Sequence, residues 1–462
     1  MGMRHGQTRG LLLIRGGTVV TAQASFRVDV LCGGVGEILA VGPDLDIPSN
    51  GTVVDAGGLL VMPGGVDPQT GIGANAAGFA RTVAALSGGT TTLLDIMHPD
   101  GDRLDAAWRD WRHAARHAHV DVGLHMAMPD SSTAVLQHMD GLVVEHGINA
   151  FHLSMADGLS DRDILKLTSH AADCGALCMI EAQNAQAIAY LRAGLDHAGI
   201  TGSEACLLSA PPAVEVEAVG RAIMLAGLSG RPVHVGPVST TGATEILAQA
   251  RLRGQRVEGH VLAAHLVVDE AVHDPEGDAA PDSCITLPPF RDGAHRRALW
   301  GGLASGNIGM VASGFRPAGG VGNGVADGLA QRMRVVWQHG VRAGILTAEE
   351  FVAATSQAAA RAFNIYPRKG AIMPGADADV VLWDPDAQET CTSGLYAGIT
   401  LGGRAVQVIR GGVTAWKDGM PCEGAGYGAY VPCPAFRPQL SERMRRAAHL
   451  SMRDGERHDR GP

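Results

Sequence analysis

The chain has 462 residues, of which 46% are hydrophobic and only 18% are charged, which is typical of a compact globular protein and excludes a disordered one. Its length allows a large domain together with a smaller one. The formal net charge of −10 argues against nucleic acid as a main partner.

Both ends of the chain are predicted to be rich in short β-strands. Turns rich in Gly, or with Pro-Asp, separate the apolar runs at each end. We therefore expect residues 1–64 and 368–420 to form one small β-sandwich built from both chain ends. The predicted strands are Leu11–Ile14, Thr18–Thr21, Arg27–Leu31, Ile38–Val41, Thr52–Val54, Leu59–Val61, Val380–Trp383, Ala405–Ile409 and Val413–Trp416.

Between these ends, residues 65–367 alternate short apolar runs with amphipathic helical patterns. About eight such units over ~300 residues predict an α/β fold, a (β/α)8 barrel of the TIM type. The predicted strands are Thr91–Ile96, Asp121–Met128, Ala150–Met155, Ala176–Glu181, Val233–Val235, Gln255–Val261 and Gly309–Ala312. The predicted helices are Gly78–Leu86, Ser132–Glu145, Asp161–Asp173, Glu215–Ala226 and Ala243–Arg253.

Residues 421–462 are predicted to form a C-terminal tail. Its first part is rich in Gly and Pro, and its charged remainder contains a basic amphipathic pattern that predicts a helix near Leu440–Met452. We expect the tail to contact the protein surface or a neighbouring subunit, and not a membrane.

The cysteines and the hydropathy pattern indicate a cytoplasmic protein. Eight cysteines are scattered through apolar segments without a Cys-x-x-Cys pair, which favours buried, reduced thiols. No segment reaches the ~18 apolar residues of a membrane span. The apolar run Leu11–Ile14 is too short for a signal peptide.

The stretch from Met62 to Gly71 reads Met-Pro-Gly-Gly-Val-Asp-Pro-Gln-Thr-Gly and follows a predicted strand. It resembles the start of the barrel in the amidohydrolase superfamily, where the pattern is Pro-Gly-x-x-Asp-x-His-x-His. The two histidines of that pattern hold a metal. Here the two positions are Gln69 and Gly71.

Further motifs lie along the chain at Gly123–Ala127, Gly147–Phe151, Pro288–Arg291, Ala362–Gly370, Pro374–Asp379 and Gly426–Phe436. They resemble motifs of the dihydropyrimidinase and hydantoinase group, whose members open cyclic amides such as dihydrouracil and hydantoins. The resemblance covers nearly the whole chain, and it implies the same barrel, sandwich and oligomer-forming tail.

The resemblance also implies six positions that hold two cations, which generate a hydroxide and polarise the amide. Only one of the six is retained, and the bridging carboxylated lysine and the aspartate general base are both replaced. Loss of five ligands removes the charge that holds the cations, so we expect no metal cofactor and no hydrolysis by the family mechanism. The six positions are Gln69, Gly71, His152, Ile180, His234 and Gly314.

The residues that clamp the substrate in this group are also altered. The tyrosine position is Asp157, and the serine before the Pro-Pro pair is Leu287. Asn323 matches the asparagine of the group's Pro-Asn-Gly. We therefore predict Leu287 and Asn323 as substrate-binding positions.

Two replacement sites remain open. A single zinc could bind to His152, His234 and His260, whereas a packed barrel histidine is the alternative interpretation of His234. In a metal-free hydrolase, His152, His234, Glu181 or Asp157 could act as acid or base. Hydrogen bonds to barrel loops are the alternative role for the two carboxylates.

The expected function is that of a dihydropyrimidinase-like and hydantoinase-like homologue without the metal centre, acting as a non-catalytic or accessory subunit. Its partners would be further copies in a dimer or tetramer, or an active paralogue in a mixed assembly. A first alternative is a metal-independent or altered-site hydrolase of a cyclic amide, imide or lactone. A second is a module that binds a small cyclic ligand without chemistry.

Overall fold

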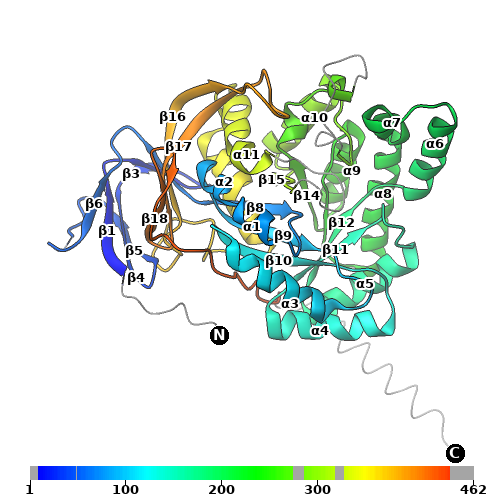
Figure 1. The fold of residues 1–462 in the computed structure, drawn as a ribbon, viewed down its shortest axis with the longest axis horizontal. Coiled ribbons are helices and arrows are strands. Elements are labelled where there is room, and N and C mark those ends of the chain that lie inside the picture. Colours follow the sequence, from blue (N-terminus) through cyan, green and yellow to red (C-terminus); the bar gives the residue numbers. More distant parts are fainter. Residues whose placement is uncertain (1–8, 48, 274–285, 318–326, 437–462) are drawn as a thin grey trace, which may run out of the picture.

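The barrel occupies the middle of the chain. The computed structural model describes residues 9–47, 49–273, 286–317 and 327–436, and Figure 1 shows the barrel beside two further β-sheets. Within these residues, eight parallel strands pair in chain order, the arrangement that successive βα units produce, so the predicted (β/α)8 barrel is confirmed. Its strands are β8 (Gly65–Thr70), β9 (Thr90–Met97), β10 (Asp121–Ala127), β11 (Ala150–Ser154), β12 (Leu177–Glu181), β13 (Val233–Val235), β14 (Val257–Leu262) and β15 (Met310–Ala312).

The first and last strands of this sheet meet through the segment that follows β15. The N–H of Gly314 donates to the carbonyl of Gln69 at 3.2 Å, and the N–H of Gly71 donates to the carbonyl of Phe315 at 2.8 Å. A parallel bridge joins Thr70 to Phe315 at the same place. This seam closes the barrel, and it contains three of the predicted ligand positions.

The helices cover the outside of the barrel because their apolar stripes pack on the strands. Ser160 and Asp163 form a capping box that starts α5, and Gly147 and Gly175 end α4 and α5 at positive φ. No helix in the described ranges is long and apolar enough to cross a bilayer. The helices are α1 (Ala76–Ala80), α2 (Val83–Ser87), α3 (Leu104–Ala114), α4 (Thr133–His146), α5 (Asp161–Cys174), α6 (Ala185–His197), α7 (Gly202–Ser209), α8 (Pro212–Ser229), α9 (Thr241–Leu252), α10 (Gly293–Ala304), α11 (Gly328–Val336), α12 (Ala348–Val352) and α13 (Ala358–Ala362), with the short turns η1 (Ala115–His117), η2 (Ala264–Leu266), η3 (Glu270–His273), η5 (Trp337–Val341) and η6 (Ala353–Gln357).

The predicted helix Gly78–Leu86 is divided into α1 and α2. At the end of α1, the Thr82 hydroxyl donates to the carbonyl of Phe79 at 2.6 Å and accepts from the N–H of His119 at 2.8 Å. These bonds tie the chain to the segment before β10 and turn it between the two helices. A continuous apolar pattern therefore spans two short helices.

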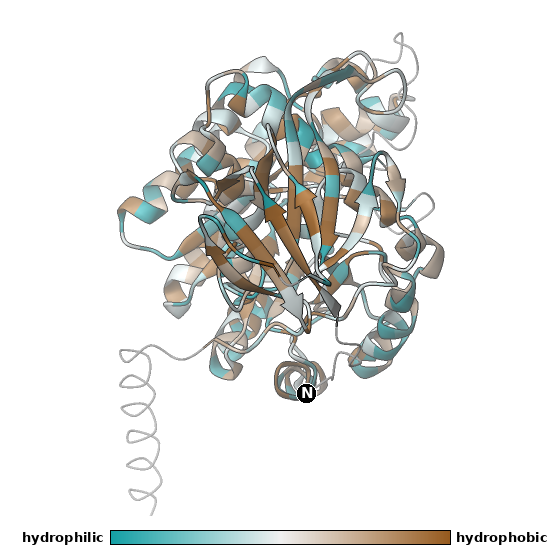
Figure 2. Ribbon diagram, turned by 90° about the vertical axis from the view of Figure 1, so that its left-hand side faces the viewer, coloured by the Kyte–Doolittle hydropathy of each residue, from teal (hydrophilic) through white to brown (hydrophobic). Residues whose placement is uncertain are grey.

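The two remaining sheets combine strands from both ends of the chain. Their orders are β5-β4-β1-β6 and β19-β18-β17-β16-β7-β2-β3. Side chains from both sheets, including Leu12, Val30 and Val380, share one apolar core, and Figure 2 shows strands at this end of the molecule largely in brown. The strands are β1 (Arg9–Arg15), β2 (Thr18–Val20), β3 (Ser25–Arg27), β4 (Asp29–Gly34), β5 (Glu37–Gly42), β6 (Thr52–Asp55), β7 (Leu60–Pro63), β16 (Val380–Thr390), β17 (Thr400–Arg410), β18 (Val413–Lys417) and β19 (Met420–Pro421).

Strands β16 and β17 are longer than the apolar runs predict. The runs predict only Val380–Trp383 and Ala405–Ile409, whereas the pairing continues to Thr390 and Thr400. The added part of β16 is polar and mostly exposed, so it has no apolar alternation from which a strand could be predicted.

The described part of the tail runs across the end of the barrel at which β10, β11 and β12 begin. The N–H of Val431 donates to the carbonyl of Val122 at 2.8 Å, and the N–H of Phe436 donates to the carbonyl of Gly175 at 2.7 Å. The helix predicted near Leu440–Met452 lies outside the described residues.

A buried ionic cluster joins the barrel, the sandwich and the tail. Nζ of Lys369 lies 2.5 Å from the carboxylates of both Asp121 and Asp379, and 3.0 Å from that of Asp377. Arg410 contacts Asp121 at 3.2 Å and donates to three carbonyls of the tail. Because these residues come from β10, β17 and the segment before β16, the cluster holds the three parts together.

Candidate functional site

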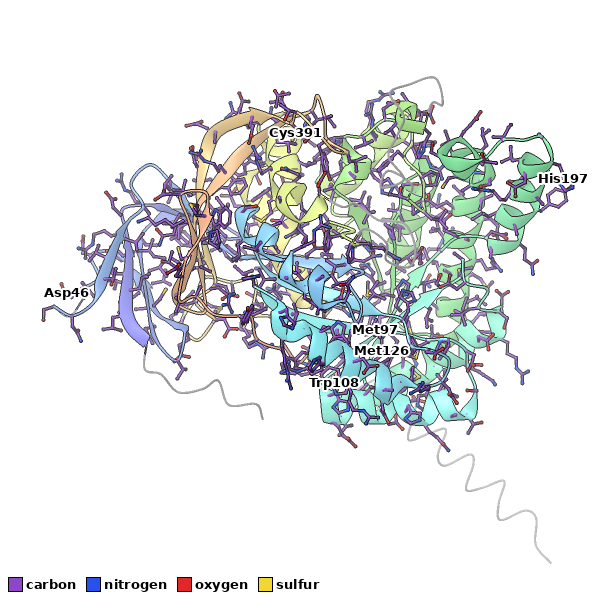
Figure 3. The ribbon with its side chains drawn as sticks, in the orientation of Figure 1. Asp46, Met97, Trp108, Met126, His197 and Cys391 are labelled. Atoms are coloured by element: carbon purple, nitrogen blue, oxygen red, sulfur yellow. The ribbon has the colours of Figure 1, made fainter. Side chains whose placement is uncertain are left out.

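The candidate site lies where the barrel strands end, which is the end at which TIM-barrel enzymes place their catalytic groups. Figure 3 labels Met97 and Met126, which pair in register at this end of β9 and β10. The positions singled out from the sequence that lie at or near these strand ends are Gln69, Gly71, His152, Ile180, Glu181, His234, His260 and Gly314.

Three of these side chains form one hydrogen-bonded chain inside the barrel. Nε2 of His234 lies 2.6 Å from Nδ1 of His260, and Nε2 of His260 contacts Oε1 of Gln69. The two rings stack with their centroids 4.8 Å apart. Burial lowers the pKa of His234 to about 3 and the pKa of His260 well below its usual value. Both histidines are therefore neutral at pH 7, and His260 uses both ring nitrogens.

His152 and Glu181 form a second group beside His98. Nε2 of His152 lies 3.3 Å from Oε2 of Glu181, and the rings of His152 and His98 meet edge-on with centroids 5.8 Å apart. Burial raises the pKa of Glu181, but His152 and then Arg316 outweigh it, so that the pKa is lowered. Burial, followed by the charges of His152 and Arg316, lowers the pKa of His98 to about 4. An ionised carboxylate beside two imidazoles is able to accept and relay protons.

The structure places Ile180, the predicted ligand position on β12, on the outer face of its strand. Ile180 belongs to the same core cluster as Leu167 of α5, whereas its neighbour Glu181 reaches His152. Adjacent residues of a strand point to opposite faces, so only one of the two can line the mouth. The family's His-Ala-Glu-Asn then falls without displacement on residues 181–184. The direction of its side chain therefore favours Glu181 over Ile180 at this ligand position.

The side chain of Arg316 fills the space beside Gly71. A Cβ added to Gly71 would lie 2.8 Å from Nε and 2.9 Å from Cγ of Arg316, distances that real Cβ atoms essentially never show. The charge of Arg316 also acts on Glu181 and His98. A guanidinium group therefore stands where the second histidine of the family pattern would project.

A buried carboxylate at the end of β9 holds the loop that carries Gly71. Asp95 accepts hydrogen bonds from the Thr70 hydroxyl at 2.7 Å and from the N–H groups of Ile72 and Gly73 at 2.7 and 3.0 Å. Several donors on one carboxylate fix the backbone of this loop, and with it the position of Gly71.

Gly314, at the position of the family's aspartate, is selected by both conformation and packing. Its φ is 61°, in the left-handed region that favours glycine, and an added Cβ would lie 2.8 Å from Cδ1 of Leu262. The side chain of Leu262 thus occupies the space that an aspartate would need to enter.

The geometry of His152, His234 and His260 does not suit a zinc ion. In the part of the chain that the structure describes, no three His, Cys, Asp or Glu side chains are arranged so that they could hold a metal ion. His260 directs its two nitrogens at Gln69 and His234, and His152 faces Glu181 instead.

The structure describes Leu287 and Asp157, two of the positions that correspond to substrate-binding residues of the family. Leu287 is half-buried directly before Pro288, and the hydroxyl of the neighbouring Thr286 donates to the carbonyl of Pro288 at 2.8 Å. Asp157 is exposed on the turn that follows β11. Asn323 lies outside the described residues.

Comparison with known proteins agrees with this arrangement of barrel and sandwich. The model of the Amidohydrolase family matches residues 60–415. The chain belongs to the amidohydrolase family. This amidohydrolase is 34% identical to a dihydropyrimidinase of Arabidopsis thaliana, over 92% of this chain and 86% of that protein. It is 31% identical to a D-hydantoinase of Geobacillus stearothermophilus, over 91% and 96%.

The solved structures agree with these relatives. The crystal structure of a dihydropyrimidinase from Brevibacillus agri superposes with a TM-score of 0.86 at 30% identity, covering 93% of this amidohydrolase and all of that chain. Together the comparisons support the dihydropyrimidinase and hydantoinase group that the sequence motifs predict.

Two side chains of the site, Arg316 and His98, are not predicted from the sequence. Arg316 lies two residues after Gly314, within the motif that has lost its aspartate. The sequence did contain an indication of its role, because this motif has an arginine and lacks the aspartate that binds metal in the family. His98 follows β9 directly, and no neighbour in sequence indicates its contact with His152.

Proposed function

We propose that this amidohydrolase no longer holds the two-cation centre of its family, does not open cyclic amides by the metal-dependent mechanism, and serves as a non-catalytic or accessory subunit. A pair of divalent ions needs several anionic and imidazole donors that converge on one place. Gly71 and Gly314 have no side chain to offer, and the amide of Gln69 is engaged by His260.

The donors that remain do not fit a pair of cations. His152 cannot form the lysine carbamate that bridges the two ions, and its nearest charged partner is Glu181 at 3.3 Å. His234 directs Nε2 at His260 rather than toward an open space. Glu181 supplies one negative charge, and the imidazoles of His152 and His234 each contact another partner. This set is too small to offset the dehydration of two divalent ions.

The place of Arg316 is the observation that carries the proposal. Its side chain fills the place at which a Cβ would project from Gly71, and its charge stabilises the ionised form of Glu181. A fixed guanidinium supplies positive charge at this point without a metal, and it repels any divalent ion that approaches.

Metal content and hydrolysis test this proposal together. We expect less than one tenth of an equivalent of zinc or other transition metal per chain after purification from metal-supplemented cells, measured by inductively coupled plasma mass spectrometry. No turnover of dihydrouracil or hydantoin should be measurable, with the Geobacillus stearothermophilus D-hydantoinase as the positive control. Stoichiometric metal together with turnover would refute the proposal.

An accessory role requires an assembly. We propose that the chain forms a dimer or tetramer with itself, or a mixed oligomer with an active paralogue, because the barrel, the sandwich and the tail contacts up to Phe436 are in place while the donor set is altered. Light scattering after size exclusion would give the oligomeric state, and tagged purification from the native cell would recover the paralogue. A monomer that brings down no paralogue would contradict this role.

The contact between His152 and Glu181 favours a second candidate function, a metal-independent hydrolase of a cyclic amide, imide or lactone. In that case Glu181 or His152 would activate water, and Arg316 would stabilise the developing oxyanion. Glu181→Gln should then abolish turnover while thermal stability stays close to that of the parent. Activity that survives both Glu181→Gln and His152→Gln would exclude this candidate.

A further inference from the structure

A cavity of about 920 Å³ lies between α3, the end of α4 and the described part of the tail. Its lining includes Asp121, the first residue of β10, so the cavity opens at the end of the barrel opposite to the candidate site. The candidate site lies where the strands finish, for example at Glu181 on β12. The cavity is therefore a separate feature, and its role does not depend on the function proposed for the mouth.

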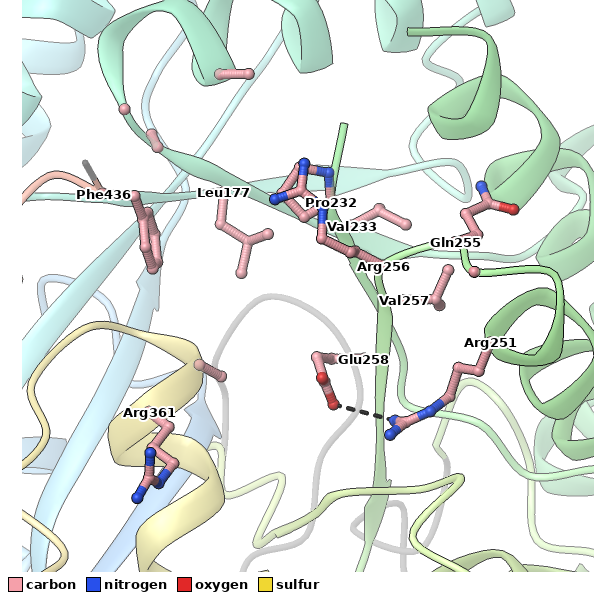
Figure 4. A pocket seen from close by; sticks show the side chains of 15 residues that line it. Leu177, Pro232, Val233, Arg251, Gln255, Arg256, Val257, Glu258, Arg361 and Phe436 are labelled. Atoms are coloured by element: carbon pink, nitrogen blue, oxygen red, sulfur yellow. Dashed lines mark hydrogen bonds and ion pairs between the residues drawn. The ribbon is translucent and has the colours of Figure 1, made fainter. Parts of the chain in front are cut away.

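Three arginines line this cavity, and no carboxylate is paired with them. Arg112 lies on α3 and Arg116 on η1, which continues that helix, whereas Arg368 lies in the segment before β16. Within the described ranges none of the three forms an ion pair, and neither Arg112 nor Arg116 donates a hydrogen bond. In a different cavity, at the start of β12, β13 and β14, Arg251 is paired with Glu258 at 3.4 Å (Figure 4). The charge of the three arginines, in contrast, is open to a ligand.

The contacts of Tyr430 show that these guanidinium groups converge. The guanidinium of Arg112 lies 5.3 Å from the centre of the Tyr430 ring, and Arg368 donates to the carbonyl of Pro432 at 3.2 Å. Burial raises the pKa of the Tyr430 hydroxyl, whereas the charges of Arg112 and Arg368 both act to lower it. Arg116 follows Arg112 by about one helical turn. Burial lowers the pKa of Arg112, and the charge of Arg116 acts in the same direction.

An aromatic cluster holds Arg112 in place. The ring of Trp108, labelled in Figure 3, stacks on that of His146 with centroids 4.8 Å apart and meets the ring of Tyr430 edge-on at 5.0 Å. The Tyr430 hydroxyl donates to the carbonyl of His146 at 2.7 Å, which ties the tail to the end of α4. Because Arg112 packs on a ring that is itself fixed, its guanidinium is positioned before any ligand binds.

The two carboxylates of the lining do not balance the arginines. Asp121 lies 2.5 Å from Lys369 and 3.2 Å from Arg410, so its charge is already compensated. Glu145 is exposed on α4, and it supplies one negative charge against the three positive ones. Two positive charges therefore remain in excess, in a protein whose formal net charge is −10. Like charges that are brought together in a partly buried place favour the binding of an anion.

We propose that this cavity binds a small phosphate monoester, with Arg112, Arg116 and Arg368 as the partners of its phosphate group. A phosphate dianion carries as many negative charges as the lining has in excess, and its oxygens accept hydrogen bonds from several guanidinium groups at once. The cavity is much larger than a phosphate ion. Val144, which is 81% exposed, and Pro432 give it apolar surface for the organic part of the ester.

Three probes separate the parts of this proposal. At about pH 8, phenyl phosphate has two negative charges and an apolar ring, benzoate has the ring and one charge, and inorganic phosphate has no ring. Isothermal titration calorimetry of the full chain at constant ionic strength should show one phenyl phosphate site per chain. Benzoate should bind at least tenfold more weakly, and inorganic phosphate at least threefold more weakly.

Substitutions assign the site to the cavity. Arg112→Gln, Arg116→Gln and Arg368→Gln should each weaken phenyl phosphate binding about fivefold, because each removes one partner of the phosphate. Glu145→Gln should strengthen it about twofold, because it removes the carboxylate that opposes the anion. Arg251→Gln, the same change in the cavity of Figure 4, is the matched control and should have no effect.

The proposal is overturned if phenyl phosphate at about 10 mM does not bind to the folded chain. Equal affinity for benzoate or for inorganic phosphate would also overturn it, as would affinities that the three arginine variants leave unchanged. Melting curves establish that each variant is folded. Arg116 is exposed, so Arg116→Gln gives the decision if a variant at a more buried position fails to fold.

Discussion

Arg316 and Gly71 share one place at the mouth of the barrel, and the proposed loss of the metal rests on this contact. A glycine alone would leave an opening that water or a neighbouring donor could fill. Here the side chain of Arg316 lies within 3 Å of the place at which a Cβ would project from Gly71. Restoring a histidine therefore requires that Arg316 move as well.

This coupling predicts the stability of Gly71→His. The imidazole overlaps Arg316, so we expect the free energy of unfolding to fall by about 1–3 kcal/mol in the parent and by clearly less in an Arg316→Ala background. Urea unfolding followed by tryptophan fluorescence measures both costs.

Gly141→His on α4 is the control for this cycle. Apart from its chain neighbours and the nearby backbone of its own helix, no atom lies within 4 Å of the Cβ that it would add, so its cost should be within about 0.5 kcal/mol of zero in both backgrounds. Equal costs of Gly71→His with and without Arg316 would show that Arg316 is not the obstacle.

Residue types were predicted better than the direction in which side chains point. The losses at Gln69, Gly71 and Gly314 are visible in the motif alone. The motif alone does not show whether Ile180 or Glu181 faces the mouth, because a shift of one residue along a strand moves a side chain to the other face. The strand alternation favours Glu181, since it is the residue of β12 that reaches His152.

At the scale of elements, the cluster around Lys369 joins parts that lie far apart in the sequence. Its ammonium group contacts three carboxylates while it is 1% exposed. Burial alone would raise the pKa of Asp121, but Lys369 and Arg410 lower it below its usual range. The cluster therefore stabilises the fold only as a complete set of charges.

Lys369→Met tests this dependence. Three buried carboxylates would lose their shared cation, so we expect the free energy of unfolding to fall by about 3–5 kcal/mol. Adding Asp379→Asn should recover part of the loss, because it removes one of the uncompensated charges. Urea unfolding of the single and double variants checks both expectations.

The matched control is Lys417→Met at an exposed position of β18, which should change stability by less than about 0.5 kcal/mol. A Lys369→Met variant as stable as the parent would mean that the carboxylates take up protons without cost. The cluster around Lys369 would then make no net contribution to stability.

At the scale of the whole molecule, the barrel interior contains buried histidines that are uncharged. Burial lowers the pKa of His125 and of His234 to about 3 in each case, so both stay uncharged in the folded protein at pH 5. In the unfolded chain the same imidazoles have an ordinary pKa near 6.5 and take up protons below it. Their contribution to stability is complete above that pH and is lost as the pH falls.

Each of these histidines should lower the free energy of unfolding by about 2 kcal/mol between about pH 7.5 and about pH 5. Other buried groups titrate over the same range, so the comparison is made between the parent and His234→Gln. The stability loss over this range should be smaller by about 2 kcal/mol in the variant, whatever its absolute stability. Identical pH dependence in urea unfolding would contradict the neutral state of His234.

The fold class and the family of this protein could be predicted from its amino-acid sequence, and so could the residue types at the mouth on which the proposed loss of the metal rests. Strand order follows chain order in a (β/α)8 barrel, and apolar periodicity marks strands and helices locally, so both can be predicted without distant contacts. Motifs around Pro374–Asp379 and Gly426–Phe436 were sufficient to indicate the family.

The contacts of the side chains at the mouth, in contrast, follow only from the fold of the whole chain. Arg316 lies beside Gly71, and His260 links Gln69 to His234, through contacts between residues from different strands and loops. Such contacts depend on register, tilt and closure of the whole barrel. A local sequence pattern cannot predict these contacts, because each depends on the relative positions of elements far apart in the sequence.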